Sequence, residues 1–314
     1  MTALSLSSQT SIQLSRRVMP RVGNTPLVRL ERITTGLVDA VEIWAKCEWT
    51  NPSGSVKDRP AHAILRQALD RGEIGDGRTL LDSTSGNMGI AYATLAAPLG
   101  LPIHMAVPAN ASAERLAVLR ALGAQLTLTD PTEGSDGARR VAAQMAAEQP
   151  ATFFYADQYS HPANWESHFH TTGPEVLAQT NGLLTHFVAG LGTTGTVTGA
   201  GRHLRQHAPH VRVVGVQPAT PLHGLEGLKH LATSPVPEIY DPSVVDEMIA
   251  VETEEAYAMA RRLARQEGLL VGVSAAAAAV AALRVAAGLE HGVIVVLFPD
   301  SGLKYLGHEF WGEP

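Results

Sequence analysis

The stretch that decides the fold is THFVAGLGTTGTVTG, residues 185–199. It begins with an apolar, β-branched run at His186–Ala189, passes through a turn of glycines and threonines, and continues into the helical pattern TGAGRHLRQHA. A short strand that leads through such a turn into a helix is the repeating unit of α/β proteins with parallel sheets. Ligands of open α/β sheets bind at the carboxyl ends of the strands, where the helices begin. The stretch therefore predicts an architecture and the sheet edge that would carry a site.

Strands and helices alternate on both sides of this stretch, which favours an α/β protein with mainly parallel sheets. One sheet would need eight or more strands, which is large, so two α/β domains are favoured, with a break near His161–Asn164. The proline-rich segment Pro218–Met248 lacks periodicity and is predicted as a long, functional loop. The predicted strands are Val41–Cys47, Thr79–Leu81, Ile103–Val107, Gln125–Thr129, Thr152–Tyr155, His186–Ala189, Arg212–Gln217 and Val293–Phe298.

Composition excludes several classes of protein. The chain has 314 residues, of which 45% are hydrophobic and 17% charged, an ordinary balance for a globular protein. A net charge of −6 argues against a nucleic-acid partner, and no apolar run reaches the roughly 20 residues of a membrane span. The one cysteine, Cys47, rules out an internal disulfide and suits a reducing cytoplasm. We therefore expect a cytoplasmic protein with small-molecule ligands and no metal site.

A second turn of unusual composition is LDSTSGNMG, residues 81–89. A predicted strand leads here into small hydroxyl residues, a glycine and an asparagine. The backbone N–H groups that open the following helix can hold an anion such as a carboxylate without any arginine. The alternative is an ordinary capped helix start, and the turn by itself leaves both interpretations open.

A third turn, NPSGSVKDRP at residues 51–60, places Lys57 where a helix should begin. The helix macrodipole disfavours a cation at this end and prefers a carboxylate. The simplest interpretation is that Asp58 supplies the carboxylate and Lys57 points into solvent. The other nearby lysine, Lys46, is expected to face solvent from its strand, and Cys47 is expected to pack as a small hydrophobic residue.

The glycine-rich turn at residues 189–200 raises a specific alternative. Gly190–Gly195 fits the dinucleotide pattern GxGxxG, which also expects an acid about twenty residues later at the end of the next strand. That strand ends in Gln217 and Pro218, so a dinucleotide-dependent dehydrogenase is disfavoured. Hydroxyl groups in the turn favour a terminal phosphate instead. A phosphate site, a carboxylate site and a lysine at a third turn together indicate pyridoxal phosphate chemistry.

The sequences of these turns resemble those of a known protein family. The matching stretches run in family order over nearly the whole chain: VGNTPLVRL, NPSGSVKDRPA, TSGNMGIA, DQYSHPAN, HTTGPEV, THFVAGLGTTGTVTG, EGLLVGVS and PDSGLKYL. The chain resembles the cysteine synthases (O-acetylserine sulfhydrylases), the B-type more than the A-type. These enzymes depend on pyridoxal 5'-phosphate and have the tryptophan-synthase-β fold, also called PLP fold type II.

The resemblance implies two α/β domains with mainly parallel, twisted sheets. The smaller, residues 48–162, would carry the Schiff-base lysine and the loop that binds the substrate carboxylate. The larger, residues 15–47 plus 163–314, would carry the phosphate loop and a serine at the pyridine nitrogen. Lys57 would then face a cleft between the domains, and the chain would form a homodimer.

The resemblance also implies residue roles. Lys57 would be the catalytic residue and would bind the cofactor covalently. The substrate carboxylate would be bound by Thr84, Ser85, Gly86, Asn87 and Gln158. The cofactor would also be held by Asn87 at its ring oxygen, by Ser301 at its ring nitrogen, and at its phosphate by Gly192, Thr193, Thr194, Gly195 and Thr196.

The implied reaction is a β-replacement that forms L-cysteine from O-acetylserine and a sulfur donor such as sulfide. Cystathionine synthesis from homocysteine, use of O-phosphoserine, and a cofactor-binding protein without turnover are the alternatives. Family members that use O-phosphoserine have an arginine where this chain has Ala219 or Thr220. Two further departures are Met88 in place of threonine and Ala275–Ala276 in place of serine-glycine, after a Ser274 that is expected to cap a helix.

Overall fold

The computed structural model describes residues 21–84 and 86–312, and the chain divides into two compact units. Unit 1 comprises residues 51–53 and 57–158, with residues 21–22. Unit 2 comprises residues 23–50, 54–56 and the chain from Tyr159 onward. The domain limits given above stay a prediction, and residues 15–20 of the larger predicted domain lie outside the described residues.

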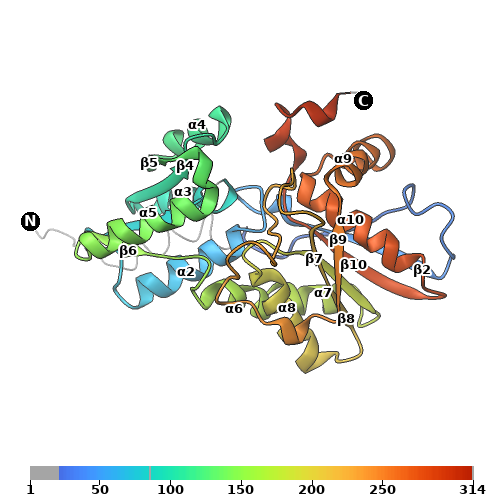
Figure 1. Cartoon of the computed structure of the whole chain (residues 1–314). Helices are drawn as coiled ribbons and strands as arrows, with labels where there is room; N and C mark the ends of the chain where they lie inside the picture. Colours follow the sequence, from blue (N-terminus) through green and yellow to red (C-terminus); the bar gives the residue numbers. More distant parts are fainter. Residues whose placement is uncertain (1–20, 85, 313–314) are drawn as a thin grey trace, which may run out of the picture. The chain divides into compact units, whose positions relative to one another are not determined.

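Unit 1 is built on a four-stranded parallel sheet in the order β5–β4–β3–β6 (Figure 1). Its strands are β3 (Thr79–Ser83), β4 (Ile103–Pro108), β5 (Gln125–Thr129) and β6 (Phe153–Tyr155). Its helices are α2 (Asp58–Asp70), α3 (Asn87–Ala96), α4 (Ala113–Ala121) and α5 (Gly134–Glu148), with short 3₁₀ turns η3 (Ala97–Leu99) and η4 (Pro131–Glu133). Helix α2 buries Ala61, Ile64, Leu65 and Ala68, whose spacing of three and four residues makes one apolar face.

Unit 2 is built on a six-stranded sheet in the order β1–β2–β10–β7–β8–β9, parallel except for the β1–β2 pair. Its strands are β1 (Leu27–Arg29), β2 (Val41–Cys47), β7 (His186–Gly190), β8 (Arg212–Pro218), β9 (Glu247–Val251) and β10 (Gly292–Phe298). Its helices are α6 (Ala163–His170), α7 (Thr172–Gln179), α8 (Gly195–His207), α9 (Thr253–Arg262) and α10 (Val273–Ala286). Short turns complete it: η2 (Glu48–Thr50), η5 (Pro242–Val244), the π-helical η6 (Leu263–Glu267), η7 (Gly302–Tyr305) and η8 (Glu309–Trp311).

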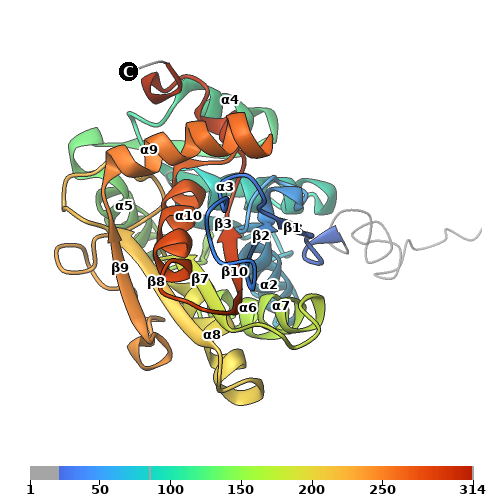
Figure 2. The same ribbon diagram turned by 90° about the vertical axis from the view of Figure 1, so that its right-hand side faces the viewer.

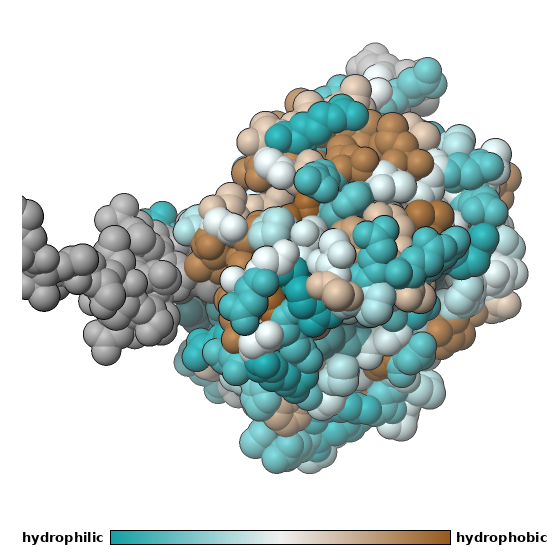
Figure 3. Space-filling model, turned by 90° about the vertical axis from the view of Figure 1, so that its left-hand side faces the viewer, coloured by the Kyte–Doolittle hydropathy of each residue, from teal (hydrophilic) through white to brown (hydrophobic). Residues whose placement is uncertain are grey.

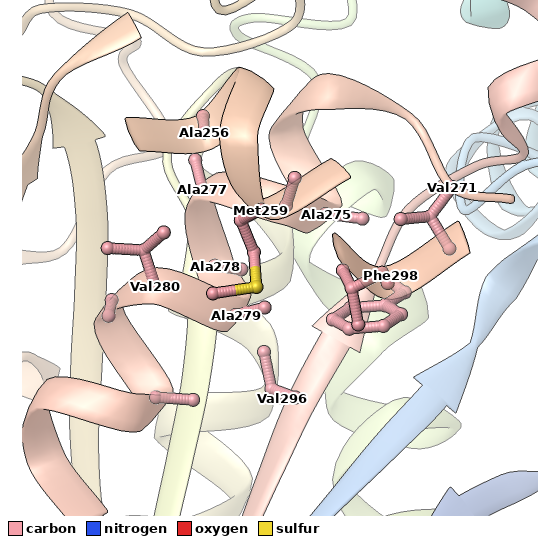
Figure 4. Packing of buried hydrophobic residues seen from close by; sticks show 14 of the residues in the cluster. Ala256, Met259, Val271, Ala275, Ala277, Ala278, Ala279, Val280, Val296 and Phe298 are labelled. Atoms are coloured by element: carbon pink, nitrogen blue, oxygen red, sulfur yellow. The ribbon is translucent and has the colours of Figure 1, made fainter. Parts of the chain in front are cut away.

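Helices cover both faces of the six-stranded sheet, which is why its strands are apolar on both sides. Helix α10 lies across β10, β7 and β8 with α9 beside it (Figure 2), and α7 and α8 contribute to a separate core on the other face. Alanines line α10, so the helix approaches the sheet closely, and Met259 reaches down between Ala278, Val296 and Phe298 (Figure 4). Ala275 and Ala276, which depart from the sequence motif of the family, belong to this core.

The fold class predicted from the sequence is confirmed, and each predicted strand exists with ends that differ by at most two residues. Two strands were missed. β1 is three residues long and half exposed, and β9 lies at the sheet edge with mixed burial, so neither has a clear alternating pattern. β9 also begins at Glu247, inside the segment predicted as a loop.

The structure corrects the expectation for Lys46. Its side chain is buried, and its ammonium group forms a salt bridge of 2.7 Å with Glu175 and donates to Gln179 and to the Thr25 carbonyl. This ion pair joins β2 to α7, so burial of the charge is offset by three acceptors. The expectation for Cys47 is confirmed: the thiol is buried, and burial raises its pKa to about 12.

The face of the molecule that Figure 3 shows carries residues of mixed polarity. In the view of Figure 3, hydrophilic residues cover most of the surface and hydrophobic ones are scattered among them. Of the helices in the described part of the chain, none combines the length and the apolar character that a membrane span requires. Isolated exposed hydrophobic residues of this kind are normal for globular proteins.

Candidate active site

The turn before α2 explains the position of Lys57. Asp58 is the first helical residue; its buried carboxylate accepts the Ser53 N–H at 3.0 Å and also bonds the Ser53 hydroxyl. The carboxylate that the macrodipole prefers is therefore supplied by Asp58, as expected. Lys57 is the N-cap residue, and its side chain is only partly exposed. The expectation of a lysine pointing freely into solvent is not met.

The carboxylate turn (residues 84–87) follows β3 and opens α3. The buried Thr84 hydroxyl accepts two backbone N–H groups, from Gly86 at 3.0 Å and Gly89 at 3.1 Å. Thr84 thus shapes the turn, while Asn87 is the first residue of α3. Gly89 has to be a glycine because a Cβ there would come within 2.5 Å of the Thr84 methyl group. Ser85, which the sequence predicts as a ligand, lies outside the described residues.

Gln158 joins this turn from the neighbouring strand. It follows β6, which pairs with β3 in the same parallel sheet, so the carboxyl ends of both strands meet at one edge. The buried Gln158 side chain donates from Nε2 to the Ser83 carbonyl at 2.8 Å. Of the predicted substrate ligands, Thr84, Gly86, Asn87 and Gln158 are thus brought together at one edge of unit 1.

A buried acid beneath this turn was missed from the sequence. Asp82, fully buried in β3, accepts the Ser83 N–H at 2.7 Å and the Gln158 N–H at 3.4 Å. Burial, with a smaller contribution from the negative charge of Asp157, raises the pKa of Asp82 to about 8. The available signal was a carboxylate inside an apolar strand, two residues before the turn. Such a position is expensive for a charged group.

The phosphate turn (residues 192–196) links β7 to α8. Thr194 is the N-cap of α8 and adopts the left-handed conformation at φ 67°, which is uncommon for a residue with a side chain. Its hydroxyl donates to the Thr193 carbonyl at 2.6 Å. The first backbone hydrogen bond of the helix comes from the N–H of Thr198 to Thr194, so the preceding N–H groups of the turn have no partner in the helix.

Helix α6 supports the phosphate turn from below. Asn164 donates from Nδ2 to the Thr193 hydroxyl at 3.2 Å, and Nε2 of the buried His168 lies 3.2 Å from the Thr196 hydroxyl. A Cβ at Gly195 would come within 2.0 Å of the Asn164 amide oxygen, and a Cβ at Gly192 within 2.2 Å of the Gly227 carbonyl. The glycines of the turn are therefore required by close packing. Sequence reasoning did not find Asn164 or His168, which lie in a helix it did not predict.

This turn fits a terminal phosphate dianion. A helix N-terminus whose first backbone N–H groups have no partner in the helix attracts an anion, and the hydroxyls of Thr193 and Thr196 add further donors. The dinucleotide alternative stays disfavoured, because β8 ends at Gln217 and Pro218, and Gln217 accepts the Leu231 N–H through its side-chain oxygen. The chemistry of the donor set thus suits the cofactor that the sequence predicts.

Ser301 lies at the same sheet edge as the phosphate turn. It follows β10, which pairs in parallel with β7, so the carboxyl ends of the two strands are neighbours. Its hydroxyl accepts the Leu303 N–H at 3.2 Å and donates to the Leu270 carbonyl at 3.4 Å. The expectation that Ser274 caps α10 is wrong: the N-cap is Gly272, which packs against the Asp300 carboxyl too closely for a side chain.

Comparisons with known proteins identify the family of the chain. A sequence model of the family described as "Pyridoxal-phosphate dependent enzyme" matches residues 18–300. The chain is 50% identical to a cysteine synthase of Aquifex aeolicus over 92% of its own length and 90% of that protein's. It is 41% identical to cysteine synthase B of Escherichia coli, covering 93% and 95%. The crystal structure of a cysteine synthase from Entamoeba histolytica is similar with a TM-score of 0.90 at 30% identity, covering 100% of this chain and 93% of that one.

Proposed function

The chain belongs to the family of pyridoxal-phosphate-dependent enzymes that includes the cysteine synthases, and from this premise we propose that it forms L-cysteine by β-replacement. The proposed substrates are O-acetylserine and a sulfur donor such as sulfide; acetate leaves the β-carbon and sulfur takes its place. The observation that carries the proposal is the 50% identity to the Aquifex aeolicus cysteine synthase along 92% of the chain.

The residues proposed to hold the cofactor come from the three turns and from Ser301. Lys57 would bind pyridoxal 5'-phosphate covalently, the phosphate turn Gly192–Thr196 would hold its phosphate, Asn87 would donate to its ring oxygen, and Ser301 would meet its ring nitrogen. The neighbouring positions of the phosphate turn and Ser301 at one sheet edge support this assignment. When bound, the cofactor withdraws electrons from the α-carbon of an amino acid, which allows loss of the α-proton and then of the β-substituent.

The chain's own residues direct this chemistry. The carboxylate turn, with Thr84, Ser85, Gly86, Asn87 and Gln158, binds the substrate carboxylate through N–H, amide and hydroxyl donors. The amine of Lys57, once free, would be the base that removes and holds the α-proton. Ser301 offers the ring nitrogen a neutral hydroxyl instead of a carboxylate, which favours elimination of a good leaving group over transamination.

The enzyme is further proposed to be a cytoplasmic homodimer. The single, buried cysteine suits a reducing compartment, and the dimer is an expectation from the family. Sedimentation equilibrium of the purified protein measures the assembly directly: a mass of one chain contradicts the dimer. A related solved structure, described as an O-acetylserine-dependent cystathionine β-synthase of Helicobacter pylori, is 33% identical and keeps homocysteine as the second candidate sulfur donor.

The reaction is tested with purified, cofactor-loaded protein. O-acetylserine and sulfide should yield L-cysteine and acetate in equal amounts, and the visible absorbance of the bound cofactor should shift when O-acetylserine is added alone. Homocysteine in place of sulfide tests the second candidate. A cofactor band that does not respond to O-acetylserine would contradict the proposed function.

A further inference from the structure

One buried acid has no part in the proposed chemistry. Strand β3 reads TLLDS, and its Asp82 is fully buried. Acids are almost never fully buried unless they are paired, because water is lost from the charged form. Asp82 has no cation as a hydrogen-bond partner in the described part of the chain. Its burial at this position calls for an explanation.

The contacts of Asp82 connect the two parts of the carboxylate site. One carboxyl oxygen accepts the Ser83 N–H at 2.7 Å, where the chain enters the carboxylate turn, and the other accepts the Gln158 N–H at 3.4 Å. The Gln158 side chain closes the ring by donating to the Ser83 carbonyl at 2.8 Å. The carboxyl group of Asp82 therefore links the end of β3 to the end of β6.

The groups that face Asp82 come from three elements. Tyr92 of α3 is fully buried against it, and its pKa is raised mainly by burial and also by Asp82. Tyr155 of β6 and Asp157, just after β6, face it as well, and Asp157 is ion-paired with Arg139 of α5 at 3.0 Å. Arg139, the one cation among these groups, is thus paired with Asp157 and not with Asp82. Asp82 is left in surroundings that favour its neutral form.

Building on the proposed function, we propose that Asp82 is a positioning residue of the substrate site: its carboxyl group fixes the two segments that bind the substrate carboxylate, and it has to be uncharged for that anion to bind. An ionised Asp82 would place a second negative charge directly beneath the bound carboxylate, in surroundings that screen it little. Because burial raises the pKa of Asp82 to about 8, the neutral form predominates at neutral pH and is lost in mild alkali.

The test is a calorimetric titration of the cofactor-loaded enzyme with L-methionine, an amino acid without a leaving group, between pH 6 and pH 9. The wild type is compared with Asp82→Asn, which keeps the size of the side chain and cannot ionise. The amine of methionine and the cofactor titrate alike in both proteins, so their effects cancel in the ratio of the two dissociation constants. Asp130→Asn, an exposed acid after β5 of the same sheet, is the matched control.

The ratio of the wild-type to the Asp82→Asn dissociation constant should rise about tenfold from pH 7 to pH 9, as for one proton lost near pH 8. Asp130→Asn should follow the wild type throughout. A purely structural role would change affinity equally at every pH, so a constant ratio overturns the inference and leaves the proposed function intact. A wild type that binds no methionine at any pH contradicts the proposed function itself.

A second variant covers the case in which Asp82→Asn does not fold. Asp157→Asn removes the negative charge that helps to raise the pKa of Asp82. The pH at which methionine binding is half lost should therefore move to a lower value than in the wild type. A midpoint that stays in place, in a folded Asp157→Asn protein, overturns the inference independently.

Discussion

The carboxylate turn and the phosphate turn are both proposed to bind an anion, but different buried side chains hold them in place. Each follows a buried parallel strand and opens a helix, and each is proposed to offer backbone N–H groups and hydroxyls to an anion. The phosphate turn rests on Asn164 and His168, which hydrogen-bond its threonine hydroxyls. The carboxylate turn rests on Asp82, a buried acid whose pKa lies near 8.

This difference matches the ligands proposed for the two turns. A cofactor phosphate stays in place over many reaction cycles, so its turn gains from close packing. A substrate carboxylate has to bind and leave in each cycle. A titratable support is compatible with that exchange, because it makes binding depend on conditions without losing the shape of the turn.

The largest expected effect comes from replacing Lys57, which belongs to neither of these two turns. Lys57→Ala should lower the rate of cysteine formation by roughly 10³-fold or more, since the variant loses both covalent attachment and the base. Borohydride reduction, followed by mass spectrometry of the intact chain, should find no cofactor attached. Lys46 cannot substitute, because its ammonium group is buried in a salt bridge with Glu175.

The control for this prediction is Lys57→Arg, which retains the positive charge and lacks the primary amine. It should be as inactive as Lys57→Ala and equally free of attached cofactor. An arginine variant with substantial activity would mean that charge, not covalent attachment, is what this position supplies.

The second prediction tests the close packing of the phosphate turn. In Gly192→Ala the new Cβ would lie 2.2 Å from the Gly227 carbonyl, a backbone atom, so the turn has to shift. Displacing the N–H groups should weaken cofactor binding by roughly 10- to 100-fold, in line with the cost of overpacking of about 1–3 kcal/mol. Fluorescence titration of apoprotein with the cofactor measures the loss.

Gly307→Ala is the matched control, since a Cβ there meets nothing within 4 Å. Gly86→Ala sharpens the comparison: its Cβ would approach the flexible Arg115 side chain at 3.4 Å, so cofactor affinity should be affected far less than in Gly192→Ala. Equal losses of cofactor affinity in Gly192→Ala and Gly86→Ala would remove the proposed division of work between the two turns.

The third prediction asks whether the substrate side also accepts a phosphate dianion. O-acetylserine should exceed O-phosphoserine by at least roughly tenfold in kcat/KM, about 1.4 kcal/mol, because a dianion needs a cation. Burial lowers the pKa of His223 and keeps it neutral, and Lys229 lies over the Tyr159 ring at 5.3 Å. A side-by-side comparison with saturating sulfide measures the preference.

The aligned position supplies a gain-of-function control. Thr220→Arg introduces the missing cation and should raise the efficiency with O-phosphoserine more than that with O-acetylserine. Equal or higher efficiency of the unaltered enzyme with O-phosphoserine would contradict the prediction and point to Lys229 as a phosphate anchor.

The same two turns show which parts of the site could be predicted from the sequence. Their strands, glycines and hydroxyls are local patterns, so β3, β7 and the residues of both turns could be predicted from the sequence. Their supports could not. Asn164 and His168 reach the phosphate turn from α6, and Gln158 reaches Ser83 from β6, contacts that depend on how distant segments pack.

Buried charge is the other limit of prediction from sequence. A lysine in an alternating strand reads as a surface residue, yet Lys46 is buried because Glu175 and Gln179, more than a hundred residues away, accept its hydrogen bonds. Asp82 is similar: its place in an apolar strand was a signal, but its hydrogen bond with the distant Gln158 could not be predicted from the sequence. Pairing across the chain, and not local composition, decides whether a charged residue lies inside.

The last prediction, with the smallest expected effect, tests the support of the carboxylate turn without any ligand. Asp82 keeps its proton in the folded protein up to about pH 8, whereas in the unfolded chain it releases the proton near the ordinary value of 3.8. Its contribution to stability is therefore complete below pH 4 and is lost as the pH rises toward 8. The amide of the Asp82→Asn variant does not titrate and cannot make the stability depend on pH in this way.

Between pH 5 and pH 8 the Tm of the Asp82→Asn apoprotein should therefore fall by at least about 2 °C less than that of the wild type, a difference on the order of 1 kcal/mol. The substitution also weakens the acceptor for the Gln158 N–H, but that cost is the same at every pH and does not alter the slope. Differential scanning calorimetry in matched buffers gives the slopes, with Asp130→Asn as the control that should follow the wild type. Parallel slopes for the wild type and Asp82→Asn would mean that the acid is ionised throughout, and Asp82 would no longer be a titratable support of the carboxylate turn.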